Sequence, residues 1–69
     1  DPALPEAHLA LGDLFLEQQR WDDAIEAYHA GLHLRPGSAE AYLGLGVAYY
    51  QQGDDTMVKE QLRFLALLD

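Results

Sequence analysis

The sequence predicts an all-α protein built from two antiparallel helix–turn–helix hairpins. The chain repeats itself after 34 residues, because that shift places Pro2 on Pro36 and Leu11-Gly12 on Leu45-Gly46. Within each unit, apolar residues recur at helical spacing on both sides of a short polar break. Fixed self-similarity at this period is the sequence signature of a helical repeat.

The first unit spans residues 5–38 and is predicted to contain helices over about 5–18 and 22–34. The break between them is so short that the two helices must lie antiparallel. Asp22 is the expected N-cap of the second helix, and the run from Arg35 to Ser38 ends that helix. The apolar residues at helical spacing are Ala7, Leu11, Leu14 and Phe15 in the first helix and Ala24, Ile25, Tyr28 and Leu32 in the second.

The second unit spans residues 39–69, with helices predicted over about 39–52 and 55–68 and a turn at Gly53-Asp54. Gly53 can adopt the positive φ that a tight helix end often requires. Asp55 and Lys59 stand where the first unit has Trp21 and Ile25. The last helix should therefore be less well anchored and should fray first.

Small residues are expected to bring the helices close together. Gly12 and Gly46 each follow a leucine of a first helix, and Gly31 lies on the second helix of the first unit. A glycine inside a helix costs about 1 kcal/mol relative to alanine, so closer packing should recover at least that much. The predicted contacts between helices are Leu11, Phe15, Ala24, Tyr28, Leu45, Tyr49 and Leu62.

These features resemble the tetratricopeptide repeat (TPR), a 34-residue helix–turn–helix with the pattern W-x2-L-G-x2-Y, then A-x3-F, then P. The resemblance covers nearly the whole chain and implies a short right-handed α-solenoid. Gln19 departs from the pattern, since the family favours glycine there. Asp1-Pro2 resembles the closing pair of a preceding repeat, so residues 1–4 are expected to end such a repeat or a linker in a larger protein. The matching residues are His8, Leu11, Gly12, Phe15, Ala24, Tyr28 and Pro36 in the first unit and Tyr42, Leu45, Gly46, Tyr49, Val58 and Leu62 in the second.

Composition argues against several classes of function. Twelve acidic residues oppose four basic ones, and a net charge of −8 disfavours binding to nucleic acid or to an anionic membrane surface. No apolar run approaches the roughly 18 residues of a membrane span. Without cysteine there is no disulfide and no thiolate zinc site. We expect a soluble protein, with the cytoplasm favoured and the compartment left open; a salt-loving source is an alternative explanation of the acidity.

Residues suited to catalysis or to binding a cofactor are scarce, so an enzyme is not expected. Ser38 and Thr56 occupy turn or cap positions. His29 and His33 lie one turn apart and are interpreted as solvated, with weak capture of a metal as the alternative, because a zinc site needs three or four ligands. His8 is interpreted as a packed, partly buried imidazole. No cofactor and no metal are predicted.

The resemblance implies that the first helices line a concave face that binds a partner peptide or helix. Acids and apolar residues dominate this face, which favours an apolar segment carrying Lys or Arg, although the acids could serve solubility alone. Some family members bind acidic chaperone tails through Lys, Asn and Arg on this face. Those positions are Leu9, Asp13 and Gly44 here, so such a ligand is disfavoured. The predicted concave face comprises Glu6, Leu9, Asp13, Leu16, Glu17, Glu40, Leu43, Val47, Tyr50 and Gln51.

The alternative function is self-assembly through an exposed last helix. Leu62, Leu65 and Leu68 lie about where a following helix would dock. Leaving several such side chains in water is costly for a small domain. We therefore expect a homodimer, formed symmetrically through this helix, if no other polypeptide covers it.

Overall fold

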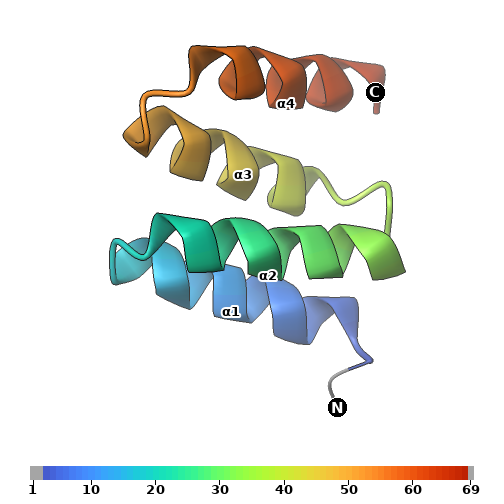
Figure 1. Ribbon diagram of the computed structural model, residues 1–69. Helices are drawn as coiled ribbons and strands as arrows, with labels where there is room; N and C mark the ends of the chain where they lie inside the picture. Colours follow the sequence, from blue (N-terminus) through green and yellow to red (C-terminus); the bar gives the residue numbers. More distant parts are fainter. Residues whose placement is uncertain (1–2, 69) are drawn as a thin grey trace.

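The computed structural model describes residues 3–68, which fold into four helices stacked in chain order (Figure 1). They are α1 (Pro5–Glu17), α2 (Trp21–Leu34), α3 (Ala39–Gln51) and α4 (Asp55–Leu67), and the described residues contain no strand. Each predicted helix is confirmed, with bounds that differ by no more than one residue at either end. The pair Asp1-Pro2, which resembles the end of a preceding repeat, lies outside the described residues.

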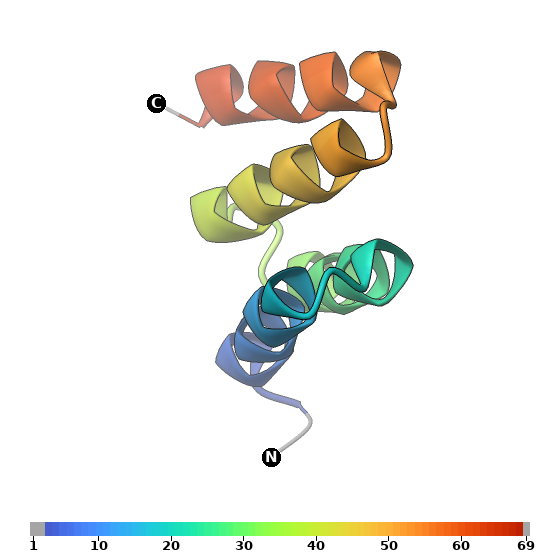
Figure 2. The same cartoon turned by 90° about the vertical axis from the view of Figure 1, so that its left-hand side faces the viewer.

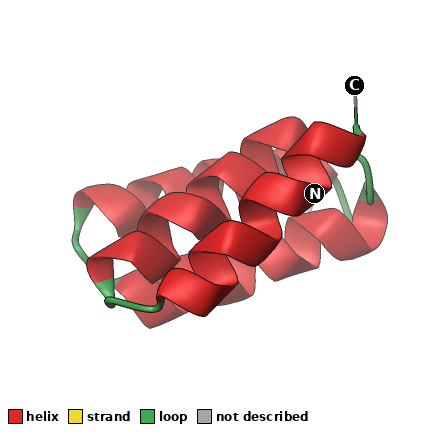
Figure 3. Cartoon of the chain, turned by 90° about the horizontal axis from the view of Figure 1, so that it is seen from above, coloured by secondary structure: helices red, strands yellow, loops and turns green. Residues whose placement is uncertain are grey.

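The helices pack as two stacked hairpins. α1 packs against α2 and α3 against α4, and the hairpins meet mainly through α2 and α3, with a smaller contact between α1 and α3. Seen from above, the helix axes have similar orientations and the loops gather at two opposite ends (Figure 3). Among the described residues, α4 packs against α3 and against no other helix.

The two turns inside the hairpins have the same backbone plan. In the first, the Arg20 amide donates to the Phe15 carbonyl at 2.9 Å, and in the second the Asp54 amide donates to the Tyr49 carbonyl at 2.9 Å. The residue before each donor is in the left-handed region: Gln19 has φ 62° and Gly53 has φ 75°. The prediction for Gly53 is confirmed. Gln19 has the same left-handed backbone conformation, which is strained for a residue with a side chain and unstrained for glycine.

Capping follows the sequence at α3. The Ala41 amide donates to Ser38 Oγ at 3.3 Å, which confirms Ser38 as a cap residue. At α4 the cap is Asp54, whose carboxylate accepts from the Met57 amide at 3.2 Å. Thr56 lies in the first turn of α4 and is not the cap.

The predicted cap of α2 is wrong. This helix begins at Trp21 with Arg20 at the N-cap position, where no side chain accepts from the helix. The carboxylate of Asp22 instead accepts a hydrogen bond from Gln52 Nε2 at 2.5 Å. Asp22 thereby links the end of α3 to the start of α2, across the interface between the hairpins.

Tyr28 and Leu45 are the largest fully buried side chains. The predicted core is confirmed for these two and for Ala24, and the rings of Phe15 and Tyr49 pack against them. It is wrong for Leu11 and Leu62, which are 42% and 55% exposed. Both lie on end helices of the stack, on surfaces that no other described helix covers. The buried cluster is Leu9, Ala24, Tyr28, Ala41 and Leu45.

Three glycines permit this close packing. A Cβ added to Gly12 or Gly44 would lie 2.7 or 2.2 Å from carbons of the Tyr28 ring, and one added to Gly31 would lie 2.9 Å from Leu9 Cδ2. The prediction is therefore confirmed for Gly12 and Gly31. It is wrong for Gly46, because the nearest atom to an added Cβ there is Gln61 Cβ at 3.9 Å, an ordinary contact.

Candidate functional site

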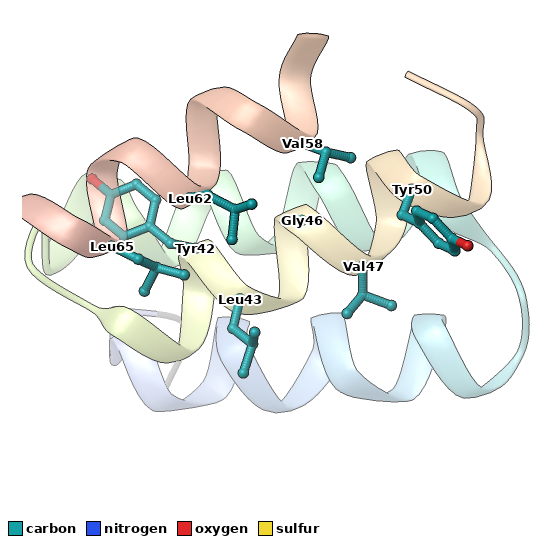
Figure 4. A pocket seen from close by; sticks show the side chains of 8 residues that line it. All are labelled: Tyr42, Leu43, Gly46, Val47, Tyr50, Val58, Leu62 and Leu65. Carbon is teal, nitrogen blue, oxygen red and sulfur yellow. The ribbon is translucent and has the colours of Figure 1, made fainter. Parts of the chain in front are cut away.

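An apolar groove lies between α3 and α4, on the end of the stack opposite α1 (Figure 4). It is open to solvent and has a volume of about 210 Å³, less than the roughly 300–1,000 Å³ typical of small-molecule pockets. Its shape and chemistry suit side chains of another polypeptide. The residues that line this α3–α4 groove are Tyr42, Leu43, Gly46, Val47, Tyr50, Val58, Leu62 and Leu65.

The groove exists because the second hairpin is more open than the first. In the first hairpin Gly31 lies against Leu9, so α1 and α2 approach closely. The residues 34 positions later are Leu65 and Leu43, two bulky side chains. They cannot both occupy the narrow space that Leu9 fills alone. Figure 2 shows α3 and α4 diverging away from the turn that joins them.

Part of the predicted concave face lines this groove. Leu43, Val47 and Tyr50 on α3 are 60%, 41% and 68% exposed, and all three contribute to the groove. Glu40 and Gln51, on the same helix, are also exposed. Leu43, Val47 and Tyr50 follow one another at helical spacing, so they form one row on α3.

On α1 the predicted face is altered by packing. Leu9 was expected to line the face, but it is 5% exposed and belongs to the core, where Gly31 leaves room for it. Leu16 is half-buried against the same core, whereas Glu17 is exposed. The contribution of α1 to the face is therefore acidic rather than apolar.

Glu6 is partly neutralised by a neighbour. Its carboxylate lies 2.5 Å from Arg35 Nη2, and both side chains are exposed. A hydrogen bond from the backbone, followed by the one from Arg35, lowers the pKa of Glu6 below its ordinary value. As an exposed pair this contributes little to stability, but it leaves Glu6 less available to a ligand.

Asp13 has a structural partner that the sequence did not indicate. The Tyr28 hydroxyl donates a hydrogen bond to the Asp13 carboxylate. Burial, then this hydrogen bond and the negative charges of Asp13 and Glu40, raise the pKa of Tyr28. Two carboxylates, one from α1 and one from α3, thus act on the same hydroxyl. A signal was available, because a buried tyrosine hydroxyl usually needs a polar partner.

The predicted self-association residues are only partly brought together. Leu62 and Leu65 line the groove, while Leu68 is exposed outside it and approaches Gly37 in the loop before α3. Three further lining residues, Tyr42, Gly46 and Val58, were absent from the predicted site. Tyr42 and Gly46 are one turn apart on α3, so helical spacing with Leu43 and Val47 could have identified them.

A second hollow, the α1–α2 hollow, lies on the first hairpin. Phe15 forms part of it, with the Arg20 guanidinium 4.7 Å from the centre of its ring. Unlike the groove, it includes two carboxylates, Asp23 and Glu26. The lining residues are His8, Leu11, Phe15, Asp23, Glu26, Ala27 and Ala30.

The histidines occupy the predicted environments. His29 and His33 are exposed, and His8 is half-buried in the hollow. His29 Nε2 lies 3.4 Å from the Tyr49 hydroxyl, across the interface between the hairpins. Within residues 3–68, no three His, Cys, Asp or Glu side chains are grouped so that they could hold a metal ion. None of the described helices has the length and apolar character needed to cross a membrane.

Comparison with known proteins agrees with the repeat plan. A family model described as a TPR repeat matches residues 12–53, which is more than half of the chain. The matched segment runs from the middle of α1, through α2 and α3, to the turn before α4. No curated protein matches the sequence.

Proposed function

The chain belongs to the tetratricopeptide repeat family, whose repeats are typically non-catalytic modules for protein–protein interaction, and we propose that its α1 and α3 bind a partner segment of apolar and basic character. The observation that carries this proposal is the exposed apolar row Leu43, Val47 and Tyr50 on α3. Contiguous exposed apolar side chains on a small domain are typical of a binding surface.

Charge supports a basic partner. Two of the four basic residues are already paired, Arg20 with Asp23 at 2.8 Å and Arg35 with Glu6 at 2.5 Å. Glu17 and Glu40 are exposed on the first helices of the hairpins, and neither has an ion pair within the described part of the chain. A Lys or Arg of the ligand would meet these carboxylates, which should raise the association rate through steering.

An acidic ligand is disfavoured at the same surface. Asp13 and Glu40 both act on the Tyr28 hydroxyl, so a further negative charge there would be repelled. Gly44 is buried against Tyr28 and Leu9 belongs to the core, so neither could supply a cationic clamp. We therefore expect this chain to bind targets other than acidic carboxyl-terminal tails.

The experiment is a calorimetric titration of the chain with apolar-basic peptides and with peptides in which Glu replaces each Lys and Arg. The basic series should bind, and rising salt should weaken its binding. Glu17→Gln with Glu40→Gln should weaken binding about fivefold, the effect of roughly 1 kcal/mol for two exposed charges. Glu26→Gln with Asp55→Asn removes two charges from the second helices and serves as the matched control. Preference for the acidic series would contradict the proposal.

A second candidate function is self-assembly through α4. It is favoured by the exposure of Leu62 and by the position of Leu65 in an uncovered apolar groove. Replacing Leu65 and Leu68 together by glutamate should then yield monomers in sedimentation. Monomers of the unmodified chain at all accessible concentrations would remove the support for this candidate.

A further inference from the structure

We infer that a second copy of this chain docks its α1 into the α3–α4 groove, head to tail, and so repeats between two molecules the contact that joins the two hairpins of one molecule. This inference deepens the second candidate function, self-assembly, and does not depend on the peptide proposal. It also differs from the symmetric dimer expected from the sequence, because the two surfaces in contact are different.

The groove has a filled counterpart inside the chain. Subtracting 34 from each lining residue gives a surface on α1 and α2, the two helices against which α3 packs. Most of it is buried, and its central residue Tyr28 is fully buried beneath Gly44 of α3. The groove thus differs from its counterpart in two ways: no described helix packs over it, and its own hairpin is more open, because Leu65 and Leu43 stand where Gly31 and Leu9 close on each other. The counterparts are His8, Leu9, Gly12, Asp13, Leu16, Ala24, Tyr28 and Gly31.

The helix that fills the counterpart surface is α3. It does so with a stripe of Ala41, Gly44, Leu45 and Ala48, all buried. The same shift gives the α1 stripe Ala7, Ala10, Leu11 and Leu14, and all four residues are exposed. Leu11 and Leu14 are 42% and 47% exposed, whereas their counterparts Leu45 and Ala48 are both fully buried. Within residues 3–68, one end of the stack therefore carries an exposed helix stripe and the other end an exposed groove.

At the centre of the proposed contact, the two facing residues differ from their counterparts in opposite directions, so the fit is maintained. Inside the chain, Tyr28 fills the surface and Gly44 leaves room for its ring. In the equivalent contact between copies, the smaller Leu62 would face Ala10. The side chain of the groove is smaller and the helix residue is larger, so the summed volume changes less than either residue alone. Volume-conserving exchanges of this kind are the ones that packed interfaces tolerate best.

Polar contacts at the rim also have counterparts. Within one chain, the Gln52 side-chain amide donates to Asp22. Between copies, Gln52 is replaced by its counterpart Gln18 of the incoming copy and Asp22 by its counterpart Thr56, which is again a donor and an acceptor. The contact between His29 and Tyr49 becomes one between Arg63 and Phe15. Arg63 makes no ion pair with any described residue, so its guanidinium is available to take the place of Arg20, which lies 4.7 Å from the centre of that ring within one chain.

The same docking would cover the α1–α2 hollow. Adding 34 to its lining residues Leu11 and Phe15 gives Leu45 and Tyr49, which pack in the interface between the hairpins. One contact would therefore bury both end surfaces. Because the two contacting surfaces differ, heterologous contacts of this kind can add further copies instead of stopping at two.

Net charge opposes this association and gives it a distinctive salt dependence. Each copy carries −8, so two copies repel one another at low ionic strength. Salt screens this repulsion, and self-association should strengthen as salt is raised. Binding of a basic peptide should weaken under the same change. Both processes use Leu43, Val47 and Tyr50, so they compete for one surface, and their opposite salt dependence distinguishes them.

The test is a complementation experiment with one blocked end per variant. Leu11→Glu blocks the helix of α1 and leaves the groove intact, whereas Leu62→Glu blocks the groove and leaves α1 intact. The unmodified chain should form oligomers larger than dimers in sedimentation at high salt. Each variant alone should associate at least about tenfold more weakly, the effect of losing one buried leucine contact. Mixing the two variants should yield a 1:1 complex, because one intact helix meets one intact groove.

Leu67→Glu is the matched control. Leu67 lies on α4, is 80% exposed, and has the exposed His33 as its counterpart. This variant should assemble like the unmodified chain. Circular dichroism checks that each variant is helical, and Leu14→Glu replaces Leu11→Glu if the latter unfolds.

Three results would overturn the inference. The first is a monomeric unmodified chain at about 1 mM and high salt. The second is undiminished association of the α1 variants, which would indicate a symmetric contact through α4. The third is failure of the folded variants to form a complex with each other.

Discussion

The two hairpins share one sequence plan and differ in how they close. The first closes around Tyr28, which is fully buried among Gly12, Gly44 and the core of α2. The second has Leu62 at the equivalent position, and this residue is 55% exposed in the α3–α4 groove. A 34-residue period therefore specifies the course of the backbone, while single positions decide whether a surface becomes core or remains a site.

The second helices show the same contrast. α2 buries Ala24, Ala27, Tyr28 and Gly31, whereas Gln61 is the buried residue of α4. α2 lies between α1 and α3, and α4 has a described helix on one side only. An interior position supplies two apolar contact surfaces, and an end position supplies one.

The largest expected effect is the difference in unfolding free energy between truncations at the equivalent positions 28 and 62. Tyr28→Ala should lower the free energy of unfolding by about 3–5 kcal/mol, as for other large buried aromatics. Leu62→Ala should cost less than about 1 kcal/mol, because half of its side chain is already in water. Urea unfolding followed by circular dichroism measures both variants. Equal losses would mean that the second hairpin is closed in solution.

Substitutions of the equivalent glycines Gly12 and Gly46 should change stability by less, and in opposite directions. Gly12→Ala should destabilise by about 1–3 kcal/mol, because its Cβ would lie 2.7 Å from the rigid, buried Tyr28 ring. Gly46→Ala should stabilise by up to about 1 kcal/mol, because alanine favours helix and meets only an ordinary contact. Thermal melts of the two variants provide the measurement. A stabilised Gly12→Ala variant would show that Tyr28 can move aside.

The two hairpins should also differ in how much stability they lose at alkaline pH. The folded state raises the pKa of Tyr28, first through burial and then through Asp13, so folding favours the protonated hydroxyl. Its contribution to stability is complete below the unfolded tyrosine pKa of about 10 and is lost as pH rises above it. Tyr49 contributes in the same direction, through burial and then the charges of Asp54 and Glu60.

Tyr28→Phe isolates the contribution of the first hairpin. It keeps the ring and removes the ionisable group, so its urea midpoint should fall less steeply between pH 10 and 12 than that of the unmodified chain. Tyr49→Phe is the companion variant and should flatten the profile less. An unchanged alkaline profile in Tyr28→Phe would assign the loss of stability to other groups.

The smallest expected effect concerns local opening. Amides of α4 should exchange with solvent faster than those of α2, because α4 is packed on one side and α2 on two. This restates the sequence expectation that the last helix frays first. Hydrogen exchange followed by NMR measures it residue by residue. Equal protection of both helices would contradict it.

Much of the fold could be predicted because the repeat is a local pattern. Helix bounds, the positive φ of Gly53 and the burial of Tyr28 and Leu45 all follow from spacing and turn chemistry. The outcome at Leu11 and Leu62 could not be predicted in this way. Periodicity shows which residues share a face, but whether a helix covers that face depends on its place in the stack.

The site was harder to predict for a related reason. Carrying the concave face over by position placed Leu9 on it, because the repeat register does not include the space created by Gly31. The Tyr28–Asp13 hydrogen bond joins residues on different helices, and no spacing rule within one helix indicates it. Contacts between helices, rather than periodicity, determine which predicted residues remain available to a partner.

The claim that both ends of the molecule are halves of one interface is tested most directly by a dilution series followed by NMR. Backbone amide signals of the unmodified chain would be recorded from about 10 µM to 1 mM at high salt. The account predicts concentration-dependent shifts along the α1 stripe (Ala7, Ala10, Leu11 and Leu14) and in the α3–α4 groove together, with one shared dissociation constant. Shifts confined to α4, or spectra that do not change with concentration, would contradict it.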